Sequence, residues 1–449
     1  MLFSKRARLS KHARRGIAAT AILGGLVGAC GWLGDSAPPP IPGNRVSVLA
    51  LDRSIKPDPV LAGLAFELPR PVENAEWPQA GGYPNHVMHH LALGDAPKVA
   101  WRVNLGEAGG DDRRILATPV VAGEVVYAMD SGRRVSAVSA ASGNSVWSFD
   151  VRPEGERDGG FGGGVAYANG RLFVATGWAQ VIALDAASGK EIWRTGVAGP
   201  VRSAPTVSGG RVLAVTIDNQ LEALSAEDGR KLWNHSAISE TAGLMGGASP
   251  AVEADAVVAA FSSGELFALR VENGRVAWQD NLAAVRRIDA ISDLADIRGR
   301  PVIDRGTVFA VSHSGRMVAI DLRTGNRIWE QEVGSLESPW VAGDYIYVLT
   351  ADSEVVCLSR GDGRIRWVRP LPRFRRETER KDPLFWAGPV VAGDRVVVVG
   401  SNREAFAISP YTGELLGTIQ LPDAVYAAPV VAGRTLYVVT DEAALIALR

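Results

Sequence analysis

The chain of 449 residues is poor in cysteine and has no excess of charge of either sign. Its two cysteines, Cys30 and Cys357, exclude a disulfide-stapled fold and leave no vicinal Cys pair and no haem-attachment motif. The 48 basic and 49 acidic side chains nearly cancel, so no net field would attract nucleic acid. Nucleophile-elbow, P-loop and zincin motifs are also absent. We therefore predict no catalytic residues, no bound cofactor or metal, and no nucleic-acid partner.

The N-terminus has the pattern of a processing signal. A basic stretch over 1–16 precedes thirteen apolar or small residues at 17–29. That run is too short to span the roughly 30 Å of a bilayer core, but it is typical of a signal peptide. It ends in "LVGAC", which resembles the bacterial lipobox, so we predict cleavage after 1–29 and acylation of Cys30. The alternative is an ordinary secretory signal in which the Cys has no role.

The residues after Cys30 indicate a location. Gly31 stands where an Asp would, by resemblance to known lipoproteins, favour retention in the inner membrane. We therefore expect a lipid anchor in the bacterial outer membrane, with the protein facing the periplasm. Residues 30–76 are Pro-rich and weakly patterned, which predicts a tether. Cys357 lies in an apolar strand pattern, which predicts a buried free thiol.

A repeated unit fills the rest of the chain. Gly followed four residues later by Trp recurs six times, and a seventh copy, "YTGELLG", has Gly417 at the Trp position. Trp101 lies in a similar strand pattern, but the Gly turn does not precede it. Each unit contains four short alternating strand patterns separated by turn residues. The six tryptophans of the complete turns are Trp147, Trp193, Trp233, Trp278, Trp329 and Trp367.

Four strands in about 45 residues, repeated without helices, are typical of a β-propeller blade. We predict an all-β, eight-bladed β-propeller of four-stranded antiparallel blades over 77–449. The strand at Trp101 would complete the last blade and so close the ring without a free edge. In each turn the Gly permits a positive φ, and the Trp would pack between blades while its indole N–H finds a backbone carbonyl.

One copy of the repeat carries a resemblance. The pattern A-x-D-x-x-x-G-K-x-x-W is complete from Ala183 to Trp193. It resembles the tryptophan-docking motif shared by quinoprotein alcohol dehydrogenases and the BamB family of outer-membrane β-barrel assembly lipoproteins, over about 95–449. The dehydrogenases carry a vicinal Cys pair and long inserted loops, which this chain lacks. The lipobox and short blades resemble the BamB family, which implies a non-enzymatic scaffold.

Two loops resemble the partner-binding loops of that family. In 281–301, the residues "IDAISD" match the Ile-Asp-x-x-Ser-Asp pattern, and a later acid is displaced by one residue. In the second loop Leu244 matches, but Met245 replaces the Arg of the family. The resemblance implies docking on the POTRA domains of BamA, as a monomer within a hetero-complex. The predicted partner-binding residues are apolar Leu244, Met245 and Leu294, with a charged surround of Asp289, Asp293 and Asp296.

Other interpretations remain open at this stage. The 281–301 loop could be a solvated surface loop, and the propeller could bind a ligand, act as an unrecognised enzyme, or serve another envelope partner. The basic insert 372–382 is a solvated face or a contact to a partner or to anionic lipid. His86, His89 and His90 lie close in sequence without an acidic or Cys partner, which disfavours a metal site. We expect Trp77 and Pro78 to cover one mouth of the propeller.

Overall fold

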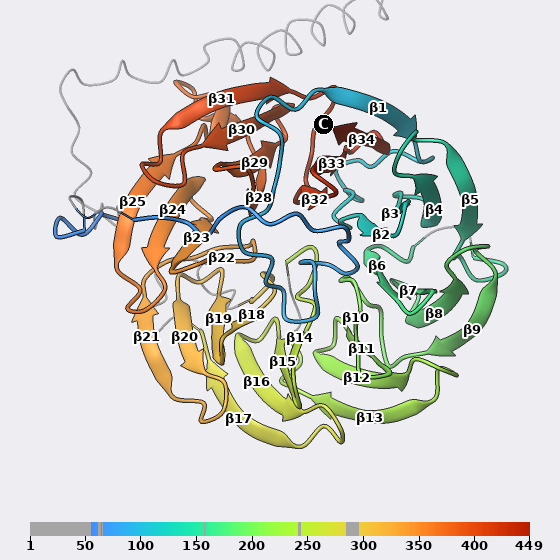
Figure 1. Cartoon of the computed structure of the whole chain (residues 1–449). Coiled ribbons are helices and arrows are strands. Elements are labelled where there is room, and N and C mark those ends of the chain that lie inside the picture. The colour runs from blue at the N-terminus through green and yellow to red at the C-terminus, as the bar shows by residue number, and fades with distance from the viewer. Residues whose placement is uncertain (1–54, 62–63, 65, 157–158, 241–243, 284–295) are drawn as a thin grey trace, which may run out of the picture. The chain divides into compact units, whose positions relative to one another are not determined.

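Eight four-stranded antiparallel sheets surround a common axis in the computed structural model (Figure 1). The structure describes residues 55–449 except for 62–63, 65, 157–158, 241–243 and 284–295. Every sheet in this part of the chain is antiparallel, so the predicted all-β, eight-bladed propeller is confirmed.

The first four blades follow one another along the chain. Blade 1 consists of β2 (Val120–Ala122), β3 (Val125–Met129), β4 (Arg134–Ser139) and β5 (Ser145–Asp150). Blade 2 consists of β6 (Gly163–Ala168), β7 (Arg171–Thr176), β8 (Gln180–Asp185) and β9 (Glu191–Gly196). Blade 3 consists of β10 (Thr206–Ser208), β11 (Arg211–Val215), β12 (Gln220–Ser225) and β13 (Lys231–Ser236). Blade 4 consists of β14 (Ala251–Glu253), β15 (Ala256–Ala260), β16 (Glu265–Arg270) and β17 (Val276–Asn281).

The other four blades include the only one that is built from both ends of the described chain. Blade 5 consists of β18 (Val302–Asp304), β19 (Thr307–Val311), β20 (Met317–Asp321) and β21 (Arg327–Gln331). Blade 6 consists of β22 (Trp340–Ala342), β23 (Tyr345–Leu349), β24 (Glu354–Ser359) and β25 (Ile365–Pro370). Blade 7 consists of β28 (Trp386–Val391), β29 (Val396–Gly400), β30 (Glu404–Ile408) and β31 (Leu415–Gln420). Blade 8 consists of β32 (Val430–Ala432), β33 (Thr435–Val439), β34 (Ala444–Leu448) and β1 (Val99–Asn104).

The core lies between the blades. The middle strands read as continuous apolar runs because both of their faces are covered by neighbouring blades. In β8, for example, the four residues from Val181 to Leu184 are completely buried. The outermost strand β9 instead carries exposed and partly buried residues, because it lies on the outside of the ring (Figure 1). Cys357 lies within this core as a buried free thiol, as predicted.

The pairing of β1 with β34 closes the ring, as predicted. Trp101 lies opposite Ala447 and Val103 opposite Leu445 in an antiparallel register. The backbone groups of Lys98 and Arg449 extend the ladder by hydrogen bonds in both directions. Closure in this way leaves blade 8 with the same four strands as the others, with β1 as its outermost strand.

The repeated tryptophans connect each blade to the next. Each indole N–H donates to a backbone carbonyl one or two residues after the third strand of the next blade. The donor–acceptor pairs are Trp101–Ala140, Trp147–Ala186, Trp193–Ala226, Trp233–Val271, Trp278–Leu322, Trp329–Arg360 and Trp367–Pro410, at 2.7–3.3 Å.

The turn glycine lies against the tryptophan of the preceding blade. Gly363 has φ of +71°, and a Cβ at this position would lie 2.6 Å from Cε3 of Trp329. Gly417 takes the Trp position in blade 7 without such a contact, because β34 of the next blade pairs with the distant β1 and forms no hairpin turn with it. The missing tryptophan therefore coincides with the missing turn.

Replacement of Gly363 with Ala should destabilise the protein by about 2 kcal/mol or more, because it adds left-handed strain and a clash with Trp329. The matched control is Gly361→Ala in the same turn, where a Cβ would meet nothing within 4 Å. Urea unfolding of both variants measures the difference. Equal stability of the two would show that the close approach to Trp329 does not constrain this position.

The segment 74–91, here called the mouth segment, crosses one mouth of the ring. It forms a hydrogen bond with each of the eight blades in circular order. The contacts are Asn74 with blade 8, Trp77 with blade 1, Pro78 with blade 2, Gln79 with blade 3, Pro84 with blade 4, Asn85 with blade 5, His89 with blade 6 and Leu91 with blade 7. The expectation that Trp77 and Pro78 cover one mouth is thus confirmed, and the cover involves a longer segment.

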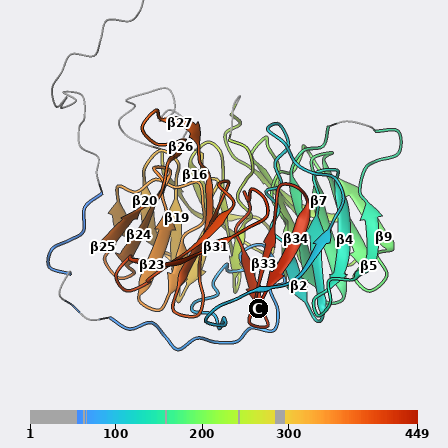
Figure 2. The ribbon, with the colours of Figure 1, turned by 90° about the horizontal axis from the view of Figure 1, so that it is seen from above.

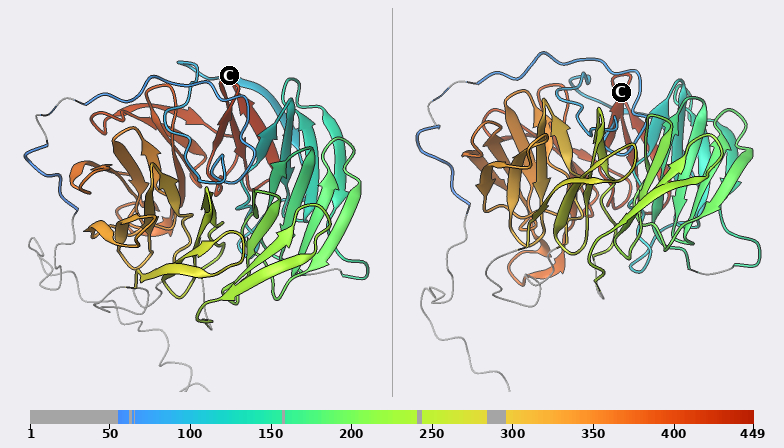
Figure 3. Two further views of the ribbon diagram at one scale, coloured as in Figure 1. Left: turned by 60° about the horizontal axis from the view of Figure 1, so that its bottom comes forward. Right: turned by 90° about the horizontal axis from the view of Figure 1, so that it is seen from below.

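The two faces of the propeller differ. Figure 2 shows the mouth segment, in blue, on one face and the β26–β27 hairpin on the opposite one, and Figure 3 shows the same arrangement from two further sides. We call these the mouth face and the loop face. The mouth segment contacts one end of the inner strands. The connections between successive blades join the strands at the other end, so they lie on the loop face. In the part of the chain that the structure describes, no helix is long and apolar enough to span a bilayer.

Candidate partner-binding site

The described ends of the two loops singled out in the sequence lie on the loop face. One joins blade 3 to blade 4 over 237–250, and the other joins blade 4 to blade 5 over 282–301. Residues 284–295 lie outside the described residues, and with them the predicted contact residues Asp289, Asp293 and Leu294. The described ends of both loops show how the neighbouring blades hold them.

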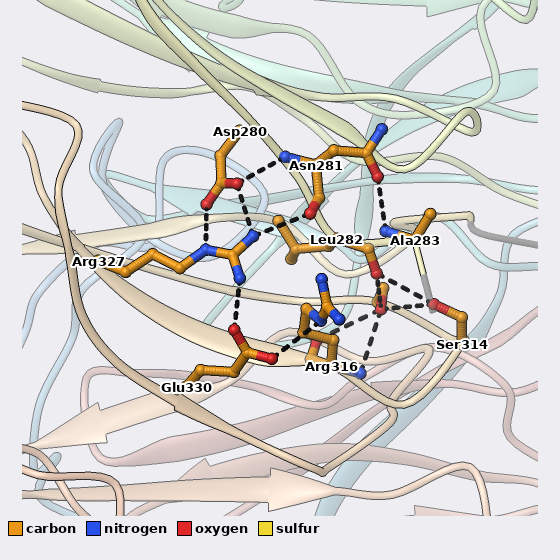
Figure 4. Close-up of polar contacts among 9 residues, drawn as sticks. Asp280, Asn281, Leu282, Ala283, Ser314, Arg316, Arg327 and Glu330 are labelled. Atoms are coloured by element: carbon orange, nitrogen blue, oxygen red, sulfur yellow. Dashed lines mark hydrogen bonds and ion pairs between the residues drawn. The ribbon is translucent and has the colours of Figure 1, made fainter. Parts of the chain in front are cut away.

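The start of the second loop is held by a bidentate ion pair (Figure 4). The Arg327 guanidinium donates to both oxygens of Asp280, at 2.7 and 2.6 Å, and to the carbonyl of Asn281 at 2.9 Å. Glu330 accepts from Arg327 on the other side and also pairs with Arg316 at 3.2 Å. A bidentate pair between an arginine and a carboxylate fixes the orientation of both side chains and also stabilises their contact. Blade 5 therefore fixes the point where the chain leaves blade 4.

Hydroxyl groups continue this anchor. Ser312 and Ser314 each donate to the carbonyl of Leu282, at 3.0 and 3.1 Å, and the two hydroxyls are 2.9 Å apart (Figure 4). The side-chain oxygen of Asn281 accepts from the backbone N–H of Ala283 at 2.7 Å. The backbone entering the loop is consequently bonded at three successive residues.

Asp296 holds the far end of the second loop against the first. Its Oδ2 accepts from the backbone N–H of Leu244 at 2.8 Å, and its carbonyl accepts from the backbone N–H of His313 at 3.0 Å. The side chain is only 6% exposed, and burial raises the pKa of this carboxyl above its ordinary value. We expected Asp296 as part of a charged surround. The structure instead shows a buried acid that positions the loop carrying Leu244.

Arg298 links the same two loops to blade 6. Its guanidinium donates to the carbonyls of Met245, at 3.4 Å, and Leu336, at 3.1 Å, and forms an ion pair with Glu337. Nothing in the local sequence distinguishes Arg298 from the many other arginines of the chain, so its role could not be predicted. It places a positive group beside Met245, the position where the sequence departs from the family pattern.

The loop face is hollowed on both sides of the 244–247 stretch. A cavity of about 370 Å³, which we call the arginine pocket, is lined by Met245 and Gly246 together with residues of blades 1 and 2. A second cavity of about 430 Å³ is lined by Leu244, Asp296 and residues of blade 3. Met245 is 44% exposed, so its thioether is available on the surface between the hollows. Of the predicted partner-binding residues, Leu244 and Asp296 are in direct contact.

The three histidines do not converge. Nδ1 of His86 is 2.7 Å from the carbonyl of Pro301, whereas Nδ1 of His90 is 2.7 Å from the carbonyl of Pro69. His89 faces Asp304 at 3.6 Å. Within the described ranges, no group of three His, Cys, Asp or Glu residues is arranged to hold a metal ion. His86 and His89 instead contact blade 5, and Nε2 of His90 accepts from the backbone N–H of Asp394 in blade 7 at 3.0 Å.

The basic insert forms a hairpin on the loop face, with strands β26 (Phe374–Arg376) and β27 (Lys381–Pro383). Arg376 pairs with Glu379 at 3.4 Å and with Asp382 at 2.9 Å. Arg373 pairs with Asp352 of blade 6 at 3.1 Å. Much of its positive charge is thus balanced locally, which favours the interpretation of a solvated face.

Comparison with known proteins decides between the two families that the repeat resembles. A family model described as "Outer membrane protein assembly factor BamB" matches residues 94–159, 131–369 and 375–449. The chain belongs to the BamB family. The BamB of Yersinia pestis is 30% identical over 304 residues, which cover 67% of this chain and 76% of that protein.

Solved structures agree on the fold. The crystal structure of BamB from Moraxella catarrhalis has a TM-score of 0.66 at 20% identity and covers 79% of this chain and 99% of its own. A quinohemoprotein alcohol dehydrogenase from Pseudomonas putida HK5 has the same TM-score at 14% identity, covering 86% of this chain and 83% of its own. The propeller alone therefore does not separate BamB from the dehydrogenases, and the sequence match does.

Proposed function

We propose that this chain is a non-enzymatic scaffold of the outer-membrane protein assembly machinery. It docks through its loop face on the POTRA domains of BamA and assists the folding and insertion of β-barrel proteins. The observation that carries this proposal is the match to the BamB family over most of the propeller. The names of the relatives, which are assembly factors of the outer membrane, point in the same direction.

The geometry of the loop face supports the proposed docking site. Asp296 and Arg298 hold the Leu244 and Met245 backbone against the next blade, so these two side chains project from a fixed base. Preordered loops lose little conformational entropy on binding. Apolar anchors between polar neighbours are typical of the centre of protein interfaces. Asp289, Asp293 and Leu294 would complete the patch from the second loop, to which Asp296 and Arg298 also belong.

The proposed function also requires attachment to the outer membrane. Acylation at Cys30 would anchor the protein in the outer membrane, and the stretch after it would let the propeller reach its partner in the periplasm. Multiple acyl chains on one cysteine supply the anchoring strength that a single chain lacks. Asp58 contacts blade 6, since its backbone N–H donates to the carbonyl of Ile365 at 2.7 Å.

A double variant of the docking patch tests the proposal. Leu244→Arg combined with Asp293→Arg should abolish co-purification with BamA, since it puts charge into the apolar centre and reverses a charge at its edge. The melting temperature should change little, because loops contribute little to the propeller core. Affinity capture from detergent-solubilised membranes measures the association.

The matched control is Leu416→Arg, which places Arg at an exposed apolar position outside the patch. Leu416 is 56% exposed and lies on the outer strand β31 of blade 7, which neither loop joins. This variant should co-purify with BamA as the unchanged protein does. Retention of BamA by a folded double variant would exclude this patch as the docking site, and the basic insert 372–382 would be tested next.

A further inference from the structure

The arginine pocket carries an arrangement that the proposed docking does not use. Its lining combines apolar side chains, among them Ile115, Met129 and Phe161, with several guanidinium groups. Its volume of about 370 Å³ lies in the range of sites for small ligands or for a single bound chain end. It opens on the loop face next to the blade 1 and blade 2 connection.

Arg133 is the central group of this pocket. It is only 6% exposed, and its backbone adopts φ of 65°. The guanidinium lies over the rings of Phe161, at 4.8 Å, and Trp178, at 5.3 Å, which hold it in a fixed plane. Its Nε donates to the carbonyl of Gly160 at 3.1 Å. Its Nη2 is buried and has no hydrogen-bond partner among the described residues.

The acidic groups beside Arg133 are already engaged. Asp130 accepts from the backbone N–H groups of Glu107 and Arg134, each at 2.8 Å. Glu107 in turn pairs with Arg113 at 3.0 Å. Desolvation by burial, and next the charge of Arg113, lower the pKa of Arg133 below its ordinary value. A buried cation that lacks a full set of partners is costly, so a ligand that supplies acceptors would be favoured.

Arg202 provides a second guanidinium group in the arginine pocket. It lines the same pocket, on the side of the connection between blades 2 and 3. Gly162 lets it approach closely, because a Cβ there would lie 2.9 Å from Cα of Arg202. Arg114 is directed elsewhere, since it stacks on the rings of Phe385 and Tyr426 at 4.5 and 4.4 Å.

We propose that the arginine pocket binds an oxyanion, a carboxylate or a phosphate, that is carried on an apolar group. Arg133 and Arg202 would donate to the oxyanion, and Ile115, Met129 and Phe161 would cover the apolar part. The two acids in the lining are the engaged Asp130 and Asp112, which is exposed. The site does not depend on the docking proposal, with which it shares only the wall formed by Met245.

Three probes of similar size test the site on the purified mature protein. N-acetylphenylalanine carries a carboxylate, phenyl phosphate carries a phosphate, and N-acetylphenylalaninamide has no charge. Calorimetric titration, with the fluorescence of the tryptophans as a second signal, should show saturable binding of at least one anionic probe. The amide should bind at least tenfold more weakly, because a charge-assisted hydrogen bond is worth about that factor or more. The ratio of the two anionic probes distinguishes carboxylate from phosphate.

Two variants assign the binding to the pocket. Arg133→Gln and Arg202→Gln should each lower the affinity of the preferred probe about tenfold, whereas Arg230→Gln, an exposed arginine of blade 3, should leave it unchanged. Arg202 is on the surface, so its variant stays informative if Arg133→Gln fails to fold. Equal binding of the amide, absence of saturation with both anions, or unchanged affinity in the Arg202 variant would overturn the proposal. None of these measurements requires BamA, so they separate this site from the docking patch.

Discussion

Replacement of Val99–Asn104 with a Gly-Ser sequence of equal length should abolish cooperative unfolding and cause aggregation. The change removes β1, so β34 loses its partner along the whole register from Val99↔Leu448 to Asn104↔Ala444. It also removes Trp101, whose indole donates to the carbonyl of Ala140 in blade 1 at 3.0 Å. The ring would then be open between blades 8 and 1, and an exposed apolar strand edge pairs readily with other chains.

Size-exclusion chromatography and thermal unfolding followed by circular dichroism measure this effect. The control is the same kind of replacement over 374–383, because the β26–β27 hairpin forms its own two-stranded sheet outside the blades. That variant should remain monomeric and should melt close to the unchanged protein. A β1 replacement that stays monomeric and unfolds in a single sharp transition would contradict closure by the N-terminal strand.

Acidification should release the mouth segment through His86. This side chain is buried, and burial, with a further contribution from Arg300, lowers its pKa to about 3. The unfolded chain, with a pKa near 6.5 for His, binds the proton earlier, so stability is fully present above pH 6.5 and declines as the pH falls toward 3. The slope approaches about 1.4 kcal/mol per pH unit for one such group, or about 3 kcal/mol between pH 7 and pH 4.

His86→Asn should remove most of this dependence, since Asn tolerates the positive φ of 63° and does not titrate. Urea unfolding at pH 7, 6, 5 and 4 should give curves for the two proteins that converge or cross as the pH falls. His89→Asn is the matched control. It also has a positive φ, but its side chain is 43% exposed and faces Asp304, so its effect should be smaller. Parallel pH curves for the unchanged protein and His86→Asn would contradict the assignment.

The fold could be predicted because residues close together in the sequence define each repeat. Gly turns, strand alternation and the Trp positions each act within a few residues, and their regular spacing gave the blade number. Even the exception followed from the pattern, because Gly417 replaces a Trp where the next blade has no turn to receive it. The closing strand was visible as a Trp strand left over at Trp101.

The mouth segment and the loop bases could be predicted only in part. Residues 74–91 contact the blades mainly through backbone groups, which any side chain supplies, so no periodic signal marks them. The sequence around Asp296 is typical of an exposed acid. Its buried position depends on a contact with Leu244, which lies 52 positions earlier in the chain. Arg133 and Arg202 meet in one pocket only because the ring brings separate blade connections together. Asp289, Asp293 and Leu294 stay predictions.

The most direct measurement of the proposed docking is site-specific photo-crosslinking in intact membranes. A photoreactive amino acid at Met245, on the loop face, should crosslink to the POTRA region of BamA. The same amino acid at Val72, which is 63% exposed beside the mouth segment, should not. Crosslinks to BamA from Val72 and none from Met245 would contradict docking through the loop face.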